Sequence, residues 1–131
     1  MELKRSTIIS PPGDEKRVRL AAEVTYRDRN IGTELYWFDV PEKHGEFLSM
    51  SGNSWLGGLL PLAVTRGEPL TIPLPIDGVL LENVSELMQI WKCWYPHLHV
   101  VPIEAEVGDA ERNRAPSKTA AFFSGGVDSF F

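Results

Sequence analysis

The stretch from Val18 to Val40, VRLAAEVTYRDRNIGTELYWFDV, decides the fold expected for most of this chain. Apolar side chains occupy every second position from Val18 to Tyr26, which is the period of a strand with one buried face. Turn residues follow at 28–32, and an aromatic and aliphatic run then continues to Val40. The pattern predicts two antiparallel strands joined by a short loop.

The segment before this hairpin has a weaker pattern. Residues 1–15 are interpreted as an entry segment, in which Ile8 and Ile9 could start a short strand before the turn residues at Pro11 and Pro12.

Two later segments carry apolar residues at helical spacing. In the first, an N-cap at Asn53 or Ser54 precedes a stripe formed by Trp55, Leu56, Leu59, Leu60, Ala63 and Val64. Because Gly57, Gly58 and Pro61 interrupt the stripe, we expect this helix to be short or broken.

The second helix is the clearer one. Its stripe is continuous and consists of Leu80, Val84, Leu87, Met88, Trp91 and Tyr95. Its start is left open between an N-cap at Asp77 and a capping box at Asn83 and Glu86, and Pro96 ends it.

Two extended segments flank this helix. The segment 70–76 is expected at a sheet edge because it contains two prolines, and 98–107 alternates as a strand.

Composition narrows the class of protein. The chain has 131 residues, of which 43% are hydrophobic and 24% charged, and its net charge is −5. These values are typical of a soluble globular protein and argue against a general polyanion binder, so specific RNA contact is the less favoured interpretation. The mostly apolar stretch 55–64 is too short to span a membrane. The single cysteine, Cys93, allows no internal disulfide and favours a cytoplasmic setting.

These patterns predict an α+β N-terminal domain over residues 1–107, built from antiparallel strands with one or two helices. The polar segment 108–118 is interpreted as a linker. Residues 119–131 then start a second domain. The segment 119–123 has apolar residues at both odd and even positions, as a strand does when both of its faces are buried in a parallel sheet.

A short glycine-containing motif follows that strand and carries the candidate chemistry. It consists of Ser124, Gly125, Gly126, Val127, Asp128 and Ser129. A strand that turns directly into a helix leaves backbone N–H groups pointing at one spot, where an anion binds. The two glycines let phosphate oxygens approach the backbone, and the two serines add hydroxyl donors. A carboxylate at Asp128 suits this site only with a divalent cation beside the phosphates, so Asp128 is assigned to Mg²⁺.

The motif resembles the pyrophosphate-binding loop (PP-loop) of the N-type ATP pyrophosphatases, which include asparagine synthetase, GMP synthetase and 7-cyano-7-deazaguanine synthase. The resemblance implies a Rossmann-like α/β domain that binds ATP and Mg²⁺ through residues 124–129. It also implies cleavage of ATP to AMP and pyrophosphate, with adenylation of a small-molecule substrate and then attack by a nitrogen or sulfur nucleophile. Since the chain ends two residues after the motif, we expect an N-terminal fragment of a larger adenylating enzyme that is inactive alone.

The alternative function is a non-catalytic recognition or homodimerisation module, formed by residues 1–117.

Few residues outside the motif 124–129 are candidates for catalysis or ligand binding. Cys93 is expected in the core, which argues against a glutamine-hydrolysing module. Two histidines on the strand 98–107 and just before it, His97 and His99, are expected to be partly buried and not to bind a metal. The remaining expectations are a solvated face for Glu104 and Glu106, core positions for Trp91 and Trp94, and a candidate base-stacking role for Trp37 and Trp55.

Overall fold

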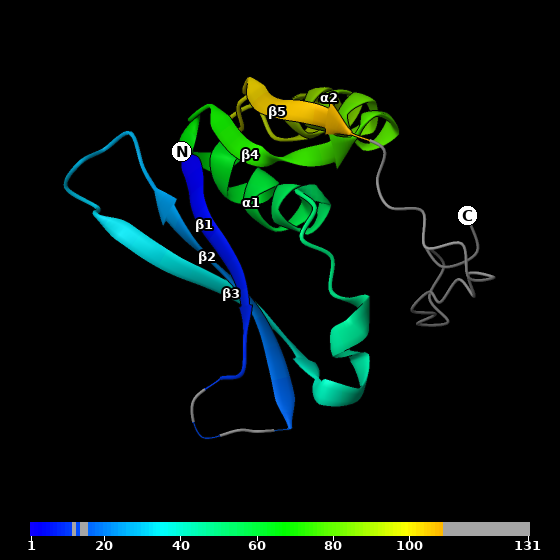
Figure 1. The fold of residues 1–131 in the computed structure, drawn as a ribbon. Coiled ribbons are helices and arrows are strands. Elements are labelled where there is room, and N and C mark those ends of the chain that lie inside the picture. Colours follow the sequence, from blue (N-terminus) through cyan, green and yellow to red (C-terminus); the bar gives the residue numbers. More distant parts are fainter. Residues whose placement is uncertain (12, 14–15, 109–131) are drawn as a thin grey trace, which may run out of the picture.

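The computed structural model describes residues 1–11, 13 and 16–108, which form an α+β fold with one mixed five-stranded sheet (Figure 1). The described elements are, in order, β1 (Glu2–Ile9), β2 (Arg17–Thr25), β3 (Thr33–Pro41), η1 (Glu42–Phe47), α1 (Asn53–Arg66), β4 (Leu70–Asp77), α2 (Gly78–Trp94) and β5 (Ile103–Gly108). Of the expected linker 108–118, Gly108 is described, as the last residue of β5, whereas residues 109–131, including the motif 124–129, lie outside the described residues.

The sheet has the strand order β3-β2-β1-β4-β5 and joins an antiparallel half to a parallel half. The expected hairpin is confirmed, since β2 and β3 pair antiparallel from Arg17↔Pro41 to Thr25↔Thr33. The expectation of an α+β domain with antiparallel strands holds for β1, β2 and β3, whereas β4 is parallel to both β1 and β5. The return from β4 to β5 runs through α2, which is the crossover that a parallel pair requires.

The interpretation of residues 1–15 as an entry segment underestimates β1, which is the central strand of the sheet. It pairs with β2 and also with β4, at Glu2↔Thr71. The alternation of buried and exposed residues in β1 is hard to recognise from the sequence. Leu3 is the one buried residue of this strand, and both of its neighbours in sequence are polar.

The expectation that two prolines confine 70–76 to an edge is also wrong, since β4 lies between β1 and β5. The pairing of β4 with β5 shifts register between Ile72 and Ile76, so Pro73 and Pro75 occupy the interruption. A proline at such an irregularity removes no regular ladder hydrogen bond.

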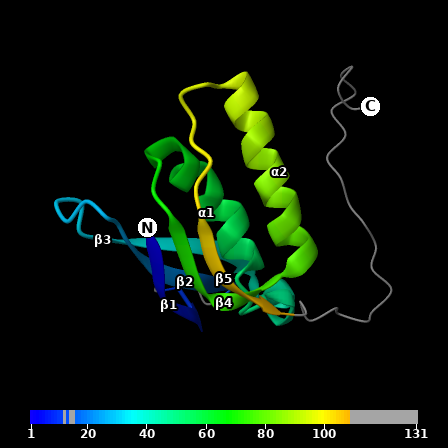
Figure 2. The same cartoon turned by 90° about the horizontal axis from the view of Figure 1, so that it is seen from above.

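Both α-helices pack on one face of the sheet and build a single core with it (Figures 1 and 2). Contrary to expectation, α1 is one continuous 14-residue helix. Its buried stripe packs in the core, whereas Gly57, Gly58 and Pro61 are exposed. Burial of the apolar stripe outweighs the weak helix propensity of these residues. Neither candidate N-cap is used, because Gly52 occupies that position.

The helix α2 begins at Gly78, and Asp77 is its N-cap, with Oδ1 accepting a hydrogen bond from Leu80 N at 3.1 Å. This resolves the start that the sequence left open. The expected core positions of Cys93 and Trp94 are wrong: Cys93 is exposed, and Trp94 is 69% exposed. Trp91 does pack against the core, as expected.

Candidate functional site

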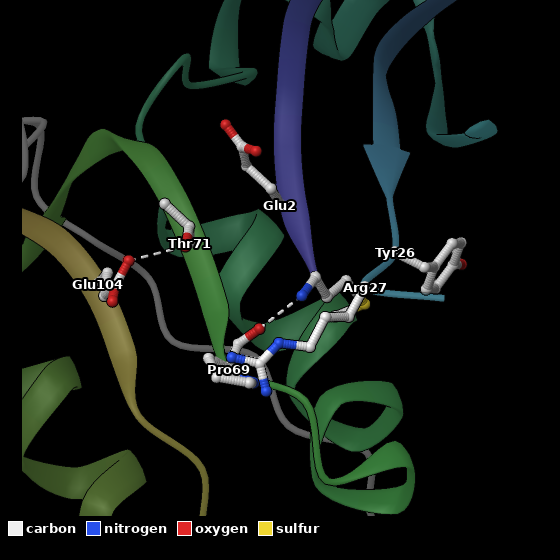
Figure 3. A pocket seen from close by; sticks show the side chains of 7 residues that line it. Glu2, Tyr26, Arg27, Pro69, Thr71 and Glu104 are labelled. Atoms are coloured by element: carbon white, nitrogen blue, oxygen red, sulfur yellow. Dashed lines mark hydrogen bonds between the residues drawn. The ribbon is translucent and has the colours of Figure 1, made fainter. Parts of the chain in front are cut away.

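The described residues contain a polar pocket of about 280 Å³ where β1, β4 and β5 begin and β2 ends (Figure 3). Its lining residues are Met1, Glu2, Tyr26, Arg27, Pro69, Thr71 and Glu104. The sequence pattern gave no sign of this pocket, because its residues come from four separate segments of the chain.

One wall of the pocket is a row of side chains across three neighbouring strands. Glu2 of β1 pairs with Thr71 of β4, and Thr71 pairs with Glu104 of β5, so the three residues stand side by side on one face. Thr71 Oγ1 donates a hydrogen bond to Glu104 Oε2 at 3.0 Å (Figure 3). The other carboxylate, that of Glu2, forms an ion pair with Lys4. The row therefore presents two carboxylates and a hydroxyl, each with a partner inside the chain.

The α-ammonium group of Met1, one of the lining residues, is held by a charge cluster around the buried carboxylate of Glu68. Met1 N donates a hydrogen bond to Pro69 O at 2.7 Å and lies 3.2 Å from Glu68 Oε2. The same carboxylate accepts hydrogen bonds from Arg27 N at 2.9 Å and from Arg66 Nε at 3.0 Å. Glu68 is the one charged residue among the described residues that is classed as buried, at 8% exposure.

Glu68 reaches this position because α1 ends directly before it. Gly67 has a φ of +67°, the left-handed conformation that commonly ends a helix, and it turns the chain toward β4. Burial alone raises the pKa of the Glu68 carboxyl, but the donors from Arg27, Met1 and Arg66 outweigh burial and hold it below its ordinary value. Glu68 is thus an ionised anchor for β1.

A second polar cluster connects the pocket to β3. The hydroxyl of Tyr26 donates to Glu34 Oε2 and lies 2.7 Å from the hydroxyl of Tyr36, which also donates to Glu34 at 3.0 Å. Burial and these hydrogen bonds raise the pKa of Tyr26, and the two hydroxyls lower the pKa of Glu34. Because the Tyr26 hydroxyl stays protonated, it serves as a hydrogen-bond donor and not as a base.

The residues that the sequence analysis singled out within 1–108 lie apart from this pocket, except for Glu104. His97 and His99 precede β5 and are exposed, so their expected place on a strand and their partial burial are both wrong. Within the part of the chain that the structure describes, no group of three or more His, Cys, Asp or Glu residues could hold a metal ion. Glu104 and Glu106 are exposed, as expected.

The two tryptophans considered for stacking differ. Trp55 is fully buried, its Nε1 donates to Ser6 Oγ at 3.1 Å, and its ring packs 5.1 Å from the ring of Phe38, so it is not available to a ligand. Trp37 is 52% exposed, with the Arg19 guanidinium 4.9 Å from its ring centroid.

Comparison with known proteins gives no relative. No family model, no curated protein and no solved structure matches the chain. Among the helices that the structure describes, none combines the length and the apolar character that crossing a membrane requires.

Proposed function

We propose that this chain is the N-terminal part of an ATP-dependent adenylating enzyme, with residues 1–107 as an accessory domain and 119–131 as the start of a Rossmann-like PP-loop domain. The motif 124–129 directly after an apolar strand pattern carries the proposal. Among the described residues, the buried core draws on the length of the proposed accessory domain, from Met1 to Val101.

The chemistry follows from the residue types of the motif. The backbone N–H groups of Gly125 and Gly126 bind the β- and γ-phosphates, and the hydroxyls of Ser124 and Ser129 add donors. Asp128 holds Mg²⁺, which neutralises charge on the departing pyrophosphate. A carboxylate or carbonyl oxygen of the substrate attacks the α-phosphorus, and the bond between that phosphorus and the bridging oxygen breaks. The adenylated substrate then loses AMP to a nitrogen or sulfur nucleophile.

The test uses the full-length protein and the exchange of labelled pyrophosphate into ATP, measured with a panel of carboxylates and carbonyl compounds. We expect Asp128→Asn to abolish exchange, because the amide cannot provide the negative charge that a divalent cation requires. Asp28→Asn is the matched control, since Asp28 lies in the exposed loop between β2 and β3. Undiminished exchange in Asp128→Asn would refute the proposal.

A further inference from the structure

The outer strand β3 forms one edge of the sheet and has β2 as its neighbour among the described strands (Figure 1). It is nine residues long and presents two large apolar side chains, Leu35 at 53% and Trp37 at 52% exposure. Long, apolar edge strands pair readily with another strand, and proteins usually shorten them or charge them. β3 has neither of these protections at its centre.

The hydrogen-bond pattern shows which backbone groups of β3 point outward. Glu42 N donates to Lys16 O at 2.8 Å and continues the register in which Arg17 is opposite Pro41. Because directly bonded pairs alternate with unbonded pairs in an antiparallel ladder, the even-numbered residues of β3 bond β2 and the odd-numbered residues point outward.

Two further observations agree with this assignment. Pro41, which has no N–H group, is odd-numbered, and the carbonyl oxygen of Asp39 accepts a hydrogen bond from Arg17 Nη2 at 3.1 Å. The outward N–H groups are therefore those of Thr33, Leu35, Trp37 and Asp39.

The side chains of these residues lie on the sheet face opposite the helices. Trp37 is opposite Ala21 of β2, whereas Phe38 points to the other face and contacts Trp55 of α1. Arg19 packs over the Trp37 ring and holds both carboxylate oxygens of Asp39, at 2.7 and 2.8 Å. The acidic residue at the end of this row is thus already neutralised within its own chain.

We propose that β3 pairs antiparallel with β3 of a second copy of this chain, around a two-fold axis that passes through Tyr36. In this register Leu35 of each copy is opposite Trp37 of the other, and Thr33 is opposite Asp39. All four outward N–H groups then find outward carbonyl groups, and the two exposed apolar side chains cover each other.

Other registers fit less well. A two-fold axis perpendicular to the sheet keeps the helices of both copies on the same face of the joined sheet. Because outward-pointing odd-numbered residues must pair with each other, the axis has to pass through a residue that lies opposite its own copy. An axis at Trp37 places Leu35 opposite the Asp39 carboxylate, and an axis at Leu35 leaves Asp39 opposite Ile31, outside the strand. Of these three axes, only the one at Tyr36 gives both exposed apolar side chains, Leu35 and Trp37, an apolar partner.

Charge also favours a second copy as the occupant. Although each chain carries a net charge of −5, the Tyr36 register brings no carboxylate opposite another. Glu34 is opposite Phe38, and Asp39, clamped by Arg19, is opposite Thr33. The strand is therefore complementary to itself in hydrogen bonding, apolar contact and charge.

The first experiment measures the mass of the 131-residue chain by sedimentation over a range of concentrations. We expect a concentration-dependent dimer, and we expect Leu35→Lys or Trp37→Lys to weaken it by about tenfold or more, because each dimer loses both copies of an apolar cross-strand pair. Val107→Lys is the matched control, since Val107 is 74% exposed on the opposite edge strand, β5.

The second experiment tests the register by cross-linking in a Cys93→Ser background. Tyr36→Cys is expected to form an intermolecular disulfide, because a residue opposite itself in an unbonded pair has a Cα separation of roughly 4.5 Å. Trp37→Cys is expected to link poorly, since its two copies are diagonal neighbours roughly 7–8 Å apart. Far-UV circular dichroism confirms that each variant is folded.

Several results would overturn the proposal. These are a monomer at every concentration, a dimer unaffected by Leu35→Lys and Trp37→Lys, or cross-linking through residue 37 in preference to 36. A monomer that binds a synthetic extended peptide along β3 would assign the edge to another partner and would also overturn it. None of these results depends on the nucleotide chemistry proposed above.

Discussion

Replacing Glu68 by glutamine tests whether the buried charge cluster anchors β1. The carboxylate contacts Met1 N, Arg27 N and Arg66 Nε, all within 3.2 Å. A glutamine keeps one acceptor oxygen but turns an NH₂ group toward one of two cations. This change leaves the buried Met1 ammonium or the Arg66 guanidinium without its counter-charge, and we expect a loss of about 2–4 kcal/mol in the free energy of unfolding.

The assay is urea denaturation followed by tryptophan fluorescence and far-UV circular dichroism at several pH values. The folded pKa of Glu68 is lowered from its ordinary value of 4.5, so its contribution to stability is fully present above pH 4.5. It is lost as the pH falls through the folded pKa, because the unfolded chain then binds the proton more readily. The difference between the native chain and Glu68→Gln is therefore expected to shrink at low pH.

Two comparisons isolate the cluster. Glu46→Gln changes an exposed carboxyl in η1 and is expected to alter stability by less than about 0.5 kcal/mol. Acetylation of the Met1 amine removes the same ion pair, so its effect is expected to overlap with that of Glu68→Gln and not to add to it. The reasoning is refuted if Glu68→Gln matches Glu46→Gln in stability, or if its loss is equal at all pH values.

Two further predictions concern glycines and the Arg19 clamp. Gly52→Ala places a Cβ 2.6 Å from Ile76 Cγ1 and is expected to cost about 1–3 kcal/mol, whereas Gly57→Ala, in open space on α1, is expected to gain about 0.5–1 kcal/mol, both measured by thermal denaturation. Equal effects at the two sites would contradict this. The hydrogen bond from Arg19 lowers the pKa of Asp39, so an NMR titration should find its midpoint below the ordinary 3.8, and Arg19→Met should return it toward that value. An unchanged midpoint in that variant would show that the clamp does not form in solution.

The amino-acid pattern predicted the local elements that carry a strong period. The hairpin of β2 and β3 and the helix α2 were readable, because alternation and a continuous helical stripe each report one buried face. The length of the helix α1 was underestimated. Helix propensity alone treats Pro61 as a break, whereas burial of the apolar stripe keeps the helix continuous.

Neighbour relations explain the remaining errors. The place of β1 at the centre of the sheet depends on partners in β2 and β4 that are distant in sequence. The two prolines of β4 predicted an edge strand, because a proline interrupts a regular hydrogen-bond ladder. The register shift that accommodates them belongs to the pairing of β4 with β5, which the sequence pattern does not show. The polar pocket was missed for the same reason, because its residues meet only in the folded sheet.

By itself the sequence determined which segments form strands and helices around residues 18–40 and 78–94, since these properties depend on neighbours within a few positions. It is also the only source of the nucleotide-binding hypothesis, which rests on residues 124–129. Tertiary structure alone decided the strand order, the cluster that joins Met1 to Glu68 across 67 positions, and the outward hydrogen-bonding groups of β3. These features depend on pairing between distant segments, which local periodicity does not encode.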